Sequence, residues 1–183
     1  MRLLEKLDDQ GLMKLCQKGD PEGFTELYKR YSRAVFNSIL RLVTDFTQAE
    51  DILQEVFVTL YEEIMKQKQI EHFGGFSKRI AVNRAISFLR QNRRILVLED
   101  YGESIVQEDE TEDEEAFELR VEDVKRAIAS LPDGFRTVVN LYLVEGLPQE
   151  DIAAMLGISH ATVRSQYHRA KKKLLSMLQK EVV

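Results

Sequence analysis

The stretch from Gln149 to Leu178 constrains the fold of this chain more than any other segment. Pro148 suits the first position of a helix, because its missing N–H costs nothing there. Gly157 can adopt the left-handed conformation that ends this helix, and Ser159 is a favoured N-cap for a second one. Apolar residues on the second helix recur at steps of four and three, which predicts a buried stripe of Val163, Tyr167, Ala170, Leu174 and Met177. Two helices joined by a short turn with glycine are typical of a helix-turn-helix.

The other face of the second helix carries groups that suit DNA. No acidic residue occurs from Ile152 to Lys180, whereas a helix kept polar only for solubility usually mixes both signs. Such an exposed helix fits the major groove, where arginine can bind guanine through two hydrogen bonds. The alternative is a solvated basic face, since cations also favour helix C-termini. The candidate DNA-contacting residues here are His160, Thr162, Arg164, Ser165, His168, Arg169 and Lys172.

Charge divides the chain into three segments that the net charge of −5 conceals. Residues 1–94 carry 16 basic and 13 acidic side chains, and residues 120–183 carry 10 and 7. Residues 95–119 carry 11 acidic side chains and no basic one. This composition predicts a disordered linker between two mildly basic domains. With few glycines and prolines in 183 residues, the fold class expected is all-α, with two helical domains and a flexible acidic linker.

The composition also limits the possible chemistry. A single cysteine, Cys16, excludes an internal disulfide and a cysteine-cluster metal site, and its apolar helical surroundings predict a buried thiol. The three histidines lack partners at ligand spacing, and no nucleophile–base pair or phosphate-binding loop occurs. We therefore predict no cofactor, no metal and no enzymatic activity. Because no apolar run approaches the length of a bilayer span and no signal peptide is recognised, we predict a cytoplasmic protein that does not insert into a membrane.

Three helices are predicted in the first domain before residue 70. Asp8 or Asp9 can cap a short helix through Gln17. Asp20 and Pro21 suit the N-cap and first position of a longer helix that runs to about Val43. The sequence Thr47-Gln48-Ala49-Glu50 forms a capping box, which opens a third helix through about Lys66.

The third helix has a wider apolar surface than one neighbour needs. Its stripe consists of Ile52, Val56, Leu60 and Ile64, with Leu53, Phe57 and Tyr61 next to it. Asp51, Gln54 and Glu55 lie beside this surface. Periodicity alone leaves two interpretations open, an ordinary amphipathic helix and a polar-rimmed surface for a protein partner.

Residues 72–98 combine cations with aromatic residues and contain no acid. Gly74-Gly75 is expected to break the chain just before a helix from about Phe76 to Asn92. Bases of single-stranded nucleic acid stack on aromatic rings while their phosphates meet cations, and the alternative is that these rings belong to the core. The candidate residues are Phe73, Phe76, Lys78, Arg79, Asn83 and Arg84.

The second domain is predicted to begin with a helix from Leu119 to Ser130. Asp133, after a turn at Leu131-Pro132, is expected to cap the next helix, and Gly146 to end it. The chain then enters the helix-turn-helix.

Together these residues resemble a bacterial RNA polymerase sigma factor of the extracytoplasmic function (ECF) group within the sigma-70 family. The resemblance covers nearly the whole chain except the acidic linker. The matching stretches, in order, are FTELYKRY, AEDILQEVFVTLY, FGGFSKRIAVNRAISFLRQNRR and SLPDGFRTVVNLYLVEGLPQEDIAAMLGISHATVRSQYHRAKKKL.

The resemblance implies a promoter-specificity subunit with a role for each segment. Residues 1–94 would bind core RNA polymerase through Asp51, Gln54, Glu55 and Phe57, and would recognise and melt the −10 element. A flipped base would be held near Gln69 to Phe76. Residues 120–183 would read the −35 element, with Arg136 as an added phosphate contact. The resemblance also implies an anti-sigma factor as a further partner.

This sequence departs from the family pattern at three places. Phe76-Ser77 stands where Trp-Leu is frequent, and Gln166 stands where arginine is usual. The linker at 95–119 is unusually acidic, and it is either a mimic of nucleic-acid phosphate or a solvated spacer. The competing interpretation of the whole chain is a stand-alone helix-turn-helix regulator with an N-terminal sensing or dimerisation domain. A sensing domain would not need the basic and aromatic segment at 72–98.

Overall fold

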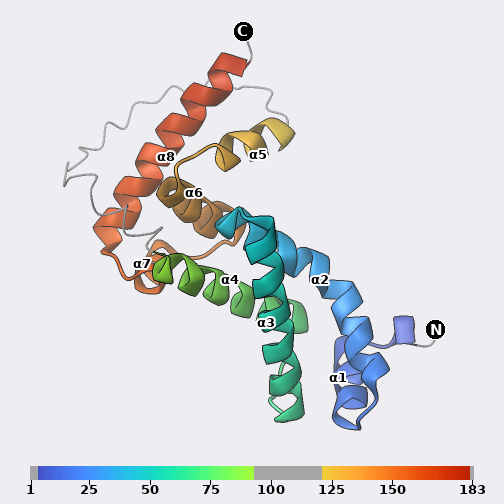
Figure 1. The fold of residues 1–183 in the computed structure, drawn as a ribbon. Helices are drawn as coiled ribbons and strands as arrows, with labels where there is room; N and C mark the ends of the chain where they lie inside the picture. Colours follow the sequence, from blue (N-terminus) through green and yellow to red (C-terminus); the bar gives the residue numbers. More distant parts are fainter. Residues whose placement is uncertain (1–3, 93–120, 182–183) are drawn as a thin grey trace. The chain divides into compact units, whose positions relative to one another are not determined.

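The structure of the protein is a computed structural model, and it describes residues 4–92 and 121–181. Within these ranges every regular element is helical and no strand occurs, which confirms the predicted all-α class. The chain divides into two compact units, residues 1–88 and 89–183, each described by itself below (Figure 1). The acidic linker predicted at 95–119 lies outside the described residues. None of the described helices is long and apolar enough to cross a membrane.

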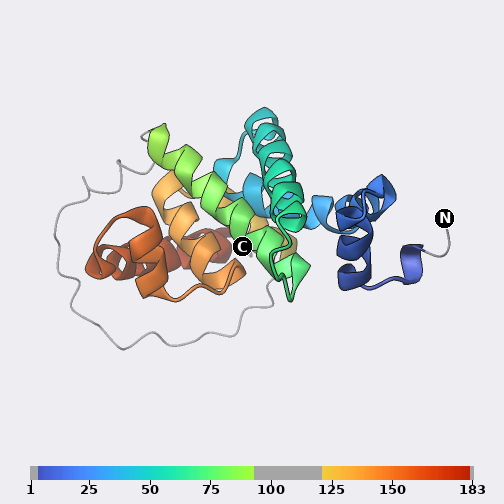
Figure 2. The same ribbon diagram turned by 90° about the horizontal axis from the view of Figure 1, so that it is seen from below.

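The first unit begins with a short 3-10 turn, η1 (Leu4–Lys6), followed by α1 (Asp9–Gln17) and α2 (Pro21–Val43). Asp8 and Asp20 are the N-caps of these two helices, as predicted. The Asp8 carboxylate accepts from the Gly11 N–H, which satisfies a helix donor that has no intrahelical partner. Figures 1 and 2 both show α1 beside the N-terminal part of α2.

Two further helices, α3 (Phe46–Met65) and α4 (Phe73–Gln91), begin earlier than the sequence predicted. The N-cap of α3 is Asp45, which accepts from the Gln48 N–H, so the capping box expected at Thr47 is wrong. Gly74 and Gly75 lie within the first turn of α4 and do not break the chain ahead of it. Glycine keeps its backbone N–H and can adopt helical angles, at an entropic cost of about 1 kcal/mol relative to alanine.

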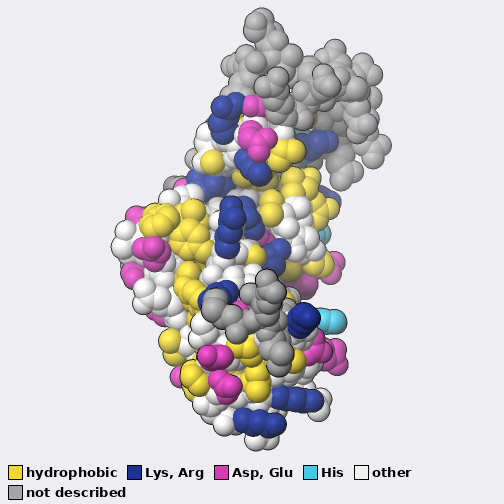
Figure 3. Space-filling view, turned by 90° about the vertical axis from the view of Figure 1, so that its right-hand side faces the viewer, with side chains coloured by type: hydrophobic (Ala, Val, Ile, Leu, Met, Phe, Trp, Pro, Cys, Tyr) yellow, Lys and Arg dark blue, Asp and Glu magenta, His cyan; other side chains and the backbone are white. Residues whose placement is uncertain are grey.

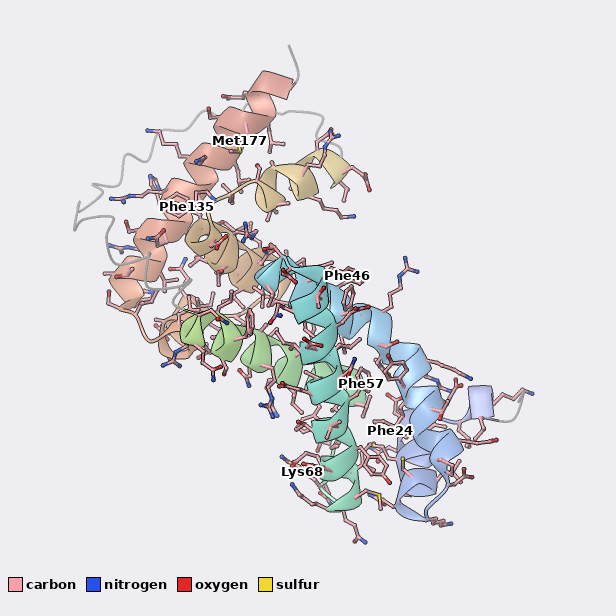
Figure 4. All side chains as sticks on the ribbon, viewed as in Figure 1. Phe24, Phe46, Phe57, Lys68, Phe135 and Met177 are labelled. Atoms are coloured by element: carbon pink, nitrogen blue, oxygen red, sulfur yellow. The ribbon has the colours of Figure 1, made fainter. Side chains whose placement is uncertain are left out.

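The core of the first unit is built from the apolar faces of all four helices. The α3 stripe is buried as predicted, and Leu12, Leu27 and Ile39 are fully buried on α1 and α2. The predicted burial of Cys16 is also confirmed, and this burial raises the pKa of its thiol. Phe24 of α2 and Phe57 of α3 point toward one another in Figure 4, with ring centroids 6.1 Å apart.

The second unit begins with α5 (Val121–Ala129) and α6 (Asp133–Val139). Pro132, and not Asp133, is the N-cap of α6, so the predicted side-chain cap is wrong. After α6 the chain continues as a π-helical turn, η3 (Asn140–Val144). The predicted regular helix up to Gly146 is therefore replaced by wider i→i+5 hydrogen bonding, such as Glu145 N–H to Asn140 O at 2.9 Å.

The helix-turn-helix consists of α7 (Gln149–Leu156) and α8 (His160–Glu181). Gly157 ends α7 in the left-handed conformation, with φ 71°, as predicted. Ser159 caps α8 as predicted, accepting from the Thr162 N–H at 3.0 Å. Pro148 is the N-cap of α7, one position earlier than expected. The core beneath α8 joins Ala127, Leu131 and Val139 to the buried residues Ala170, Leu174 and Leu178, with Tyr167 and Met177 packed against them.

Candidate nucleic-acid interfaces

The outer face of α8 presents an exposed basic row. His160, Arg164, His168 and Lys172 follow one another at steps of four residues, and all four are exposed. Side chains four residues apart lie on the same face of a helix, one turn above another. Thr162, Ser165 and Arg169 are half-buried beside this row. All seven predicted residues thus lie on the part of the α8 surface that the buried stripe leaves uncovered.

The start of α8 is fixed by the turn that precedes it. Gly157 donates to the Ala153 carbonyl at 2.9 Å, and Ile158 donates to the same oxygen at 3.1 Å. The Ser159 hydroxyl then lies 2.8 Å from that of Thr162, besides capping the helix. The first turn of α8, where a recognition helix usually meets base edges, is therefore held by backbone and hydroxyl contacts.

Two predictions around α8 need correction or refinement. Arg136 is only 7% exposed, and its guanidinium donates to the Leu131 carbonyl at 2.9 Å and pairs with Asp133 at 2.5 Å. Arg136 therefore holds the turn between α5 and α6. The predicted phosphate contact at Arg136 is wrong, because the guanidinium is buried and bound within the protein. Gln166 is 3% exposed. This position, where the family usually has arginine, therefore offers almost no surface for DNA.

The aromatic residues at the start of α4 differ sharply in exposure. Phe73 is fully buried, with its ring 5.1 Å from that of Tyr31, so it belongs to the core and cannot stack on a base. The predicted stacking role of Phe73 is therefore wrong. Phe76 is half-buried, and its ring meets two cations, the Lys68 ammonium at 5.1 Å and the Arg79 guanidinium at 5.7 Å. Such contacts are typical of cation–π interactions.

The polar candidates on α4 lie mostly at its surface. Arg79, Asn83 and Arg84 are exposed, and Lys78 is half-buried. Arg84 lies against α3, where it is 3.8 Å from the Glu55 carboxylate and 3.4 Å from the Thr59 hydroxyl. These contacts orient Arg84 at the surface, and an exposed pair of this kind contributes little to stability.

Ser77 explains one departure from the family pattern. It is fully buried, and its hydroxyl donates to the Gly74 carbonyl at 2.9 Å. This bond satisfies the buried hydroxyl, which would otherwise lack a partner, and so allows a polar residue to lie where the family frequently has leucine.

Sequence reasoning missed Lys68 in the loop between α3 and α4. Its ammonium lies 2.7 Å from the Glu63 carboxylate as well as over the Phe76 ring, and Figure 4 shows it just beyond the end of α3. Hydrogen bonds from Lys68 and Lys66 hold the pKa of Glu63 below its ordinary value. The signal available in the sequence was the pair of lysines in KQKQ, immediately before the aromatic segment.

The exposed side of α3 is a third candidate surface, for a protein. Asp51, Gln54, Glu55 and Val58 are exposed at helical spacing on one face, and Val58 is 59% exposed. Phe57, in contrast, is 4% exposed and packs on Phe24 and Tyr28, so its predicted polymerase contact is wrong. An apolar residue three positions after Gln54 was the signal that could have identified Val58.

Other large apolar side chains also reach solvent. In the first unit they include Tyr28, Tyr61 and Met65, each 42–43% exposed. In the second unit Leu143 and Val144, at the end of the π-helical turn, are 54% and 41% exposed. Figure 3 shows that hydrophobic patches alternate with charged side chains on one face of the molecule.

A helix-turn-helix that presents a basic row, in a chain whose described elements are all helical, is typical of DNA-binding proteins. Residues 27–95 match the family described as "Sigma-70 region 2", and residues 121–174 match "Sigma-70, region 4". The "RNA polymerase sigma-H factor" of Pseudomonas aeruginosa is 30% identical, over 97% of this chain and 97% of its own length. The "ECF RNA polymerase sigma-E factor" of Haemophilus influenzae is 32% identical, over 97% and 98%. The chain therefore belongs to the ECF sigma factors of the sigma-70 family.

The same fold occurs in solved structures. One is the sigma factor RpoE in complex with the anti-sigma factor NepR from Bartonella quintana, with a TM-score of 0.51 at 20% identity over 85% of this chain and 96% of that one. Another is CnrH in complex with the cytosolic domain of CnrY, with a TM-score of 0.51 at 23% identity over 94% and 97%. Family membership makes the chain a promoter-specificity factor and not an enzyme, and nothing in these matches supports a stand-alone regulator with a sensing domain.

Proposed function

We propose that this sigma factor divides promoter recognition between residues 1–94, which bind the polymerase and the −10 element, and residues 120–183, which bind the −35 element. The observation that carries the proposal is the presence of two different candidate nucleic-acid surfaces, one on α8 and one on α4. The matches to the two named sigma regions, one on each segment, support the same division.

For the −35 element, α8 would enter the major groove of duplex DNA. Arg164 and Arg169 would bind guanine or phosphate, and His160, Thr162, Ser165, His168 and Lys172 would complete the contact. What supports this is the exposed row at steps of four residues, together with the fixed first turn. Bidentate arginine–guanine pairs would supply most of the base discrimination.

For the −10 element, α4 would bind the open non-template strand. Phe76 would offer its half-exposed ring to an unpaired base, and Lys78, Arg79 and Arg84 would follow the phosphates. Asn83 would read a base edge, since an amide both donates and accepts. A duplex hides the base faces, so holoenzyme that binds the open strand more tightly would favour melting.

For the polymerase, the exposed face of α3 at Asp51, Gln54, Glu55 and Val58 would be the docking surface. The partners would be core RNA polymerase, promoter DNA and an anti-sigma factor. The last is supported by the anti-sigma complex of the structurally similar RpoE. The site of action would be the cytoplasm, where RNA polymerase works, with no insertion of this chain into a membrane.

Transcription from a defined promoter tests the proposal. The purified protein is added to core RNA polymerase, and run-off transcripts are sequenced at their 5′ ends. We expect transcripts from promoters that share −35 and −10 elements, and loss of those transcripts when either element is scrambled. Core polymerase alone is the control. Equal transcription from scrambled promoters would refute the proposal.

A further inference from the structure

The N-terminal helix α1 donates hydrogen bonds to the last turn of α3 and to the end of the loop at residues 66–72, which joins α3 to α4. Near its start, the Gln17 side-chain amide donates to the Ile64 carbonyl at 3.1 Å. At its end, the Gln10 amide donates to the Ile70 carbonyl at 2.6 Å and lies 3.4 Å from the Glu71 carbonyl. Residues seven apart lie two turns apart on one helix face, so α1 presents both donors to the loop at once.

The two acceptors differ in what else they bind. The Ile64 carbonyl, in the last turn of α3, also accepts from the Gln67 N–H at 3.0 Å, so the Gln17 amide is a second donor to it. Ile70 is 5% exposed, so its carbonyl lies at a buried anchor of the loop. Between the two anchors the loop turns through Gln67, whose φ of 57° is left-handed. The end of α3 itself holds this conformation, since the Gln67 N–H donates to the Ile64 carbonyl at 3.0 Å and the Lys68 N–H to the Glu63 carbonyl at 3.3 Å.

A second set of contacts links α1 to the first turn of α4. The Tyr31 hydroxyl donates to the Asp9 carboxylate at 2.5 Å. The Tyr31 ring packs against Phe73 at 5.1 Å between ring centroids. A Cβ atom added to Gly74 would lie 2.8 Å from Tyr31 Cε1, closer than real side chains approach. Glycine is thus required at position 74 so that the first turn of α4 can rest on Tyr31.

We propose that Gln10, Gln17 and Tyr31 are positioning residues, through which α1 holds residues 66–72 and the first turn of α4 ready to receive the −10 single strand. This inference rests on the function proposed above for α4. The held segment carries Lys68, whose ammonium lies over the Phe76 ring. The three residues themselves do not touch DNA in this proposal. They act by setting the place of Lys68 and Phe76.

Pre-organisation explains why such support would matter. A loop that had to become ordered when DNA binds would lose conformational entropy at that step, and the affinity would fall accordingly. Two side-chain hydrogen bonds and a packed ring would instead order the loop when the protein folds. The gain in affinity should therefore be specific to single-strand binding. Binding through the docking face of α3 and through the α8 row should be unaffected.

The test uses the full-length chain with Gln10→Ala and Gln17→Ala combined, and separately Tyr31→Phe, which keeps the ring but removes the hydroxyl. Gln48→Ala, in the first turn of α3, is the matched control. Hydrogen exchange of residues 66–72 is measured on the free protein. Holoenzyme binding is then titrated with a −10 single strand, and binding to −35 duplex and to core polymerase is measured in parallel.

In the double variant we expect faster exchange at residues 66–72 and about a fivefold loss of single-strand affinity, the scale of one hydrogen bond. Tyr31→Phe should show a smaller loss, and Gln48→Ala none. Affinities for −35 duplex and for polymerase should not change. Unchanged exchange, or unchanged strand affinity, would overturn the inference. A uniform loss of all three affinities would also overturn it, because α1 would then be a general structural support. If wild-type holoenzyme fails to bind the strand, the function proposed for α4 fails first and this inference with it.

Discussion

The two helices proposed to contact DNA, α8 and α4, present their side chains in different ways. On α8 the contact row of His160, Arg164, His168 and Lys172 follows from helix geometry alone, with the core on the other side. On α4 the aromatic residues Phe73 and Phe76 differ in exposure. Phe73 is fully buried, whereas Phe76 is half-buried and its ring contacts two cations. The start of α4 is therefore defined by tertiary contacts, and the outer face of α8 by periodicity.

This difference corresponds to the two targets proposed. Duplex DNA offers a regular groove, and a straight helix with a regular row of side chains fits it. A single strand has no fixed shape, so a protein that captures it must supply the shape itself. We therefore expect changes on α8 to act on binding directly, and changes near α4 to act partly through the fold.

The largest effect should come from Phe73→Ala, which tests whether Phe73 belongs to the core. Removing a fully buried ring leaves a cavity and should lower the free energy of unfolding by about 3–5 kcal/mol. Urea unfolding followed by circular dichroism measures this loss. Phe76→Ala is the matched control and should cost much less stability. If Phe73→Ala kept its stability but lost single-strand binding, the stacking role rejected above would be restored.

Arg164→Ala and Arg169→Ala test the exposed row. Each should weaken −35 duplex binding by about 1–3 kcal/mol if the arginine binds a guanine in bidentate fashion. The measurement is a titration of duplex with the full-length protein at fixed salt. Lys125→Ala, on α5, removes the same charge from the same unit and should have little effect. Native affinity in both arginine variants would move −35 recognition away from this face.

Phe76→Ala and Asn83→Ala test strand capture by α4. Base stacking contributes about 1–3 kcal/mol per base, and we expect the lower end because the Phe76 ring is only half-exposed. Permanganate footprinting of the −10 region should show weaker reactivity in both variants than in wild type. Ser87→Ala, exposed on the same helix, should behave like wild type. Wild-type reactivity in both variants would place strand capture in the preceding loop.

Much of this fold could be predicted from the sequence because its signals are local. The caps at Asp8, Asp20 and Ser159, the left-handed Gly157 and the α8 stripe all depend on residues within a turn or two of one another. For the same reason the candidate residues on α8 could be named from the helical period. The period did not separate the exposed row from Thr162, Ser165 and Arg169, which are half-buried.

The predictions that were wrong concern side chains whose burial or hydrogen bonding is decided by residues distant in the sequence. The sequence alone suggests that Arg136 is a cation available to DNA. In the structure its guanidinium donates to carbonyls at and just after the end of α5. Phe57 and Phe73 lie at the edge of apolar stripes, where only the neighbouring helix α2 decides that they are buried. The same holds for Gln10 and Gln17, since no local pattern reveals that their amides reach a loop more than 40 residues away.

Asp51→Ala combined with Gln54→Ala tests the docking face of α3, where periodicity again sets the surface. Both residues are exposed and off the core, so we expect normal helicity by circular dichroism. Affinity for core polymerase should fall by more than about 1 kcal/mol, the usual threshold of a significant interface residue. Glu22→Ala, on α2, removes one exposed carboxylate as a control. Native polymerase affinity with normal helicity would place docking elsewhere.

Tyr31, which contacts Asp9 of α1 and Phe73 of α4, should make the stability of this region depend on pH. Burial, and then the hydrogen bond to the Asp9 carboxylate, raise the pKa of Tyr31 from 10.0 to about 12. Below pH 10 the hydroxyl is protonated in both the folded and the unfolded chain, so its contribution to stability is fully present. Between pH 10 and 12 the unfolded chain loses this proton first, and stability is lost as the pH rises.

The difference in the free energy of unfolding between wild type and Tyr31→Phe should therefore become smaller as the pH increases. At pH 8 the variant lacks the bond to Asp9 and should be less stable by about 1 kcal/mol, the typical net value of one hydrogen bond. By pH 11 wild type is losing its contribution, whereas phenylalanine has nothing to titrate at this site. Urea midpoints at pH 8, 10 and 11 measure the trend, and the other tyrosines are common to both proteins. A difference that stayed constant across this range would mean that the Tyr31 hydroxyl is not held by Asp9, and that α1 supports the start of α4 through ring packing alone.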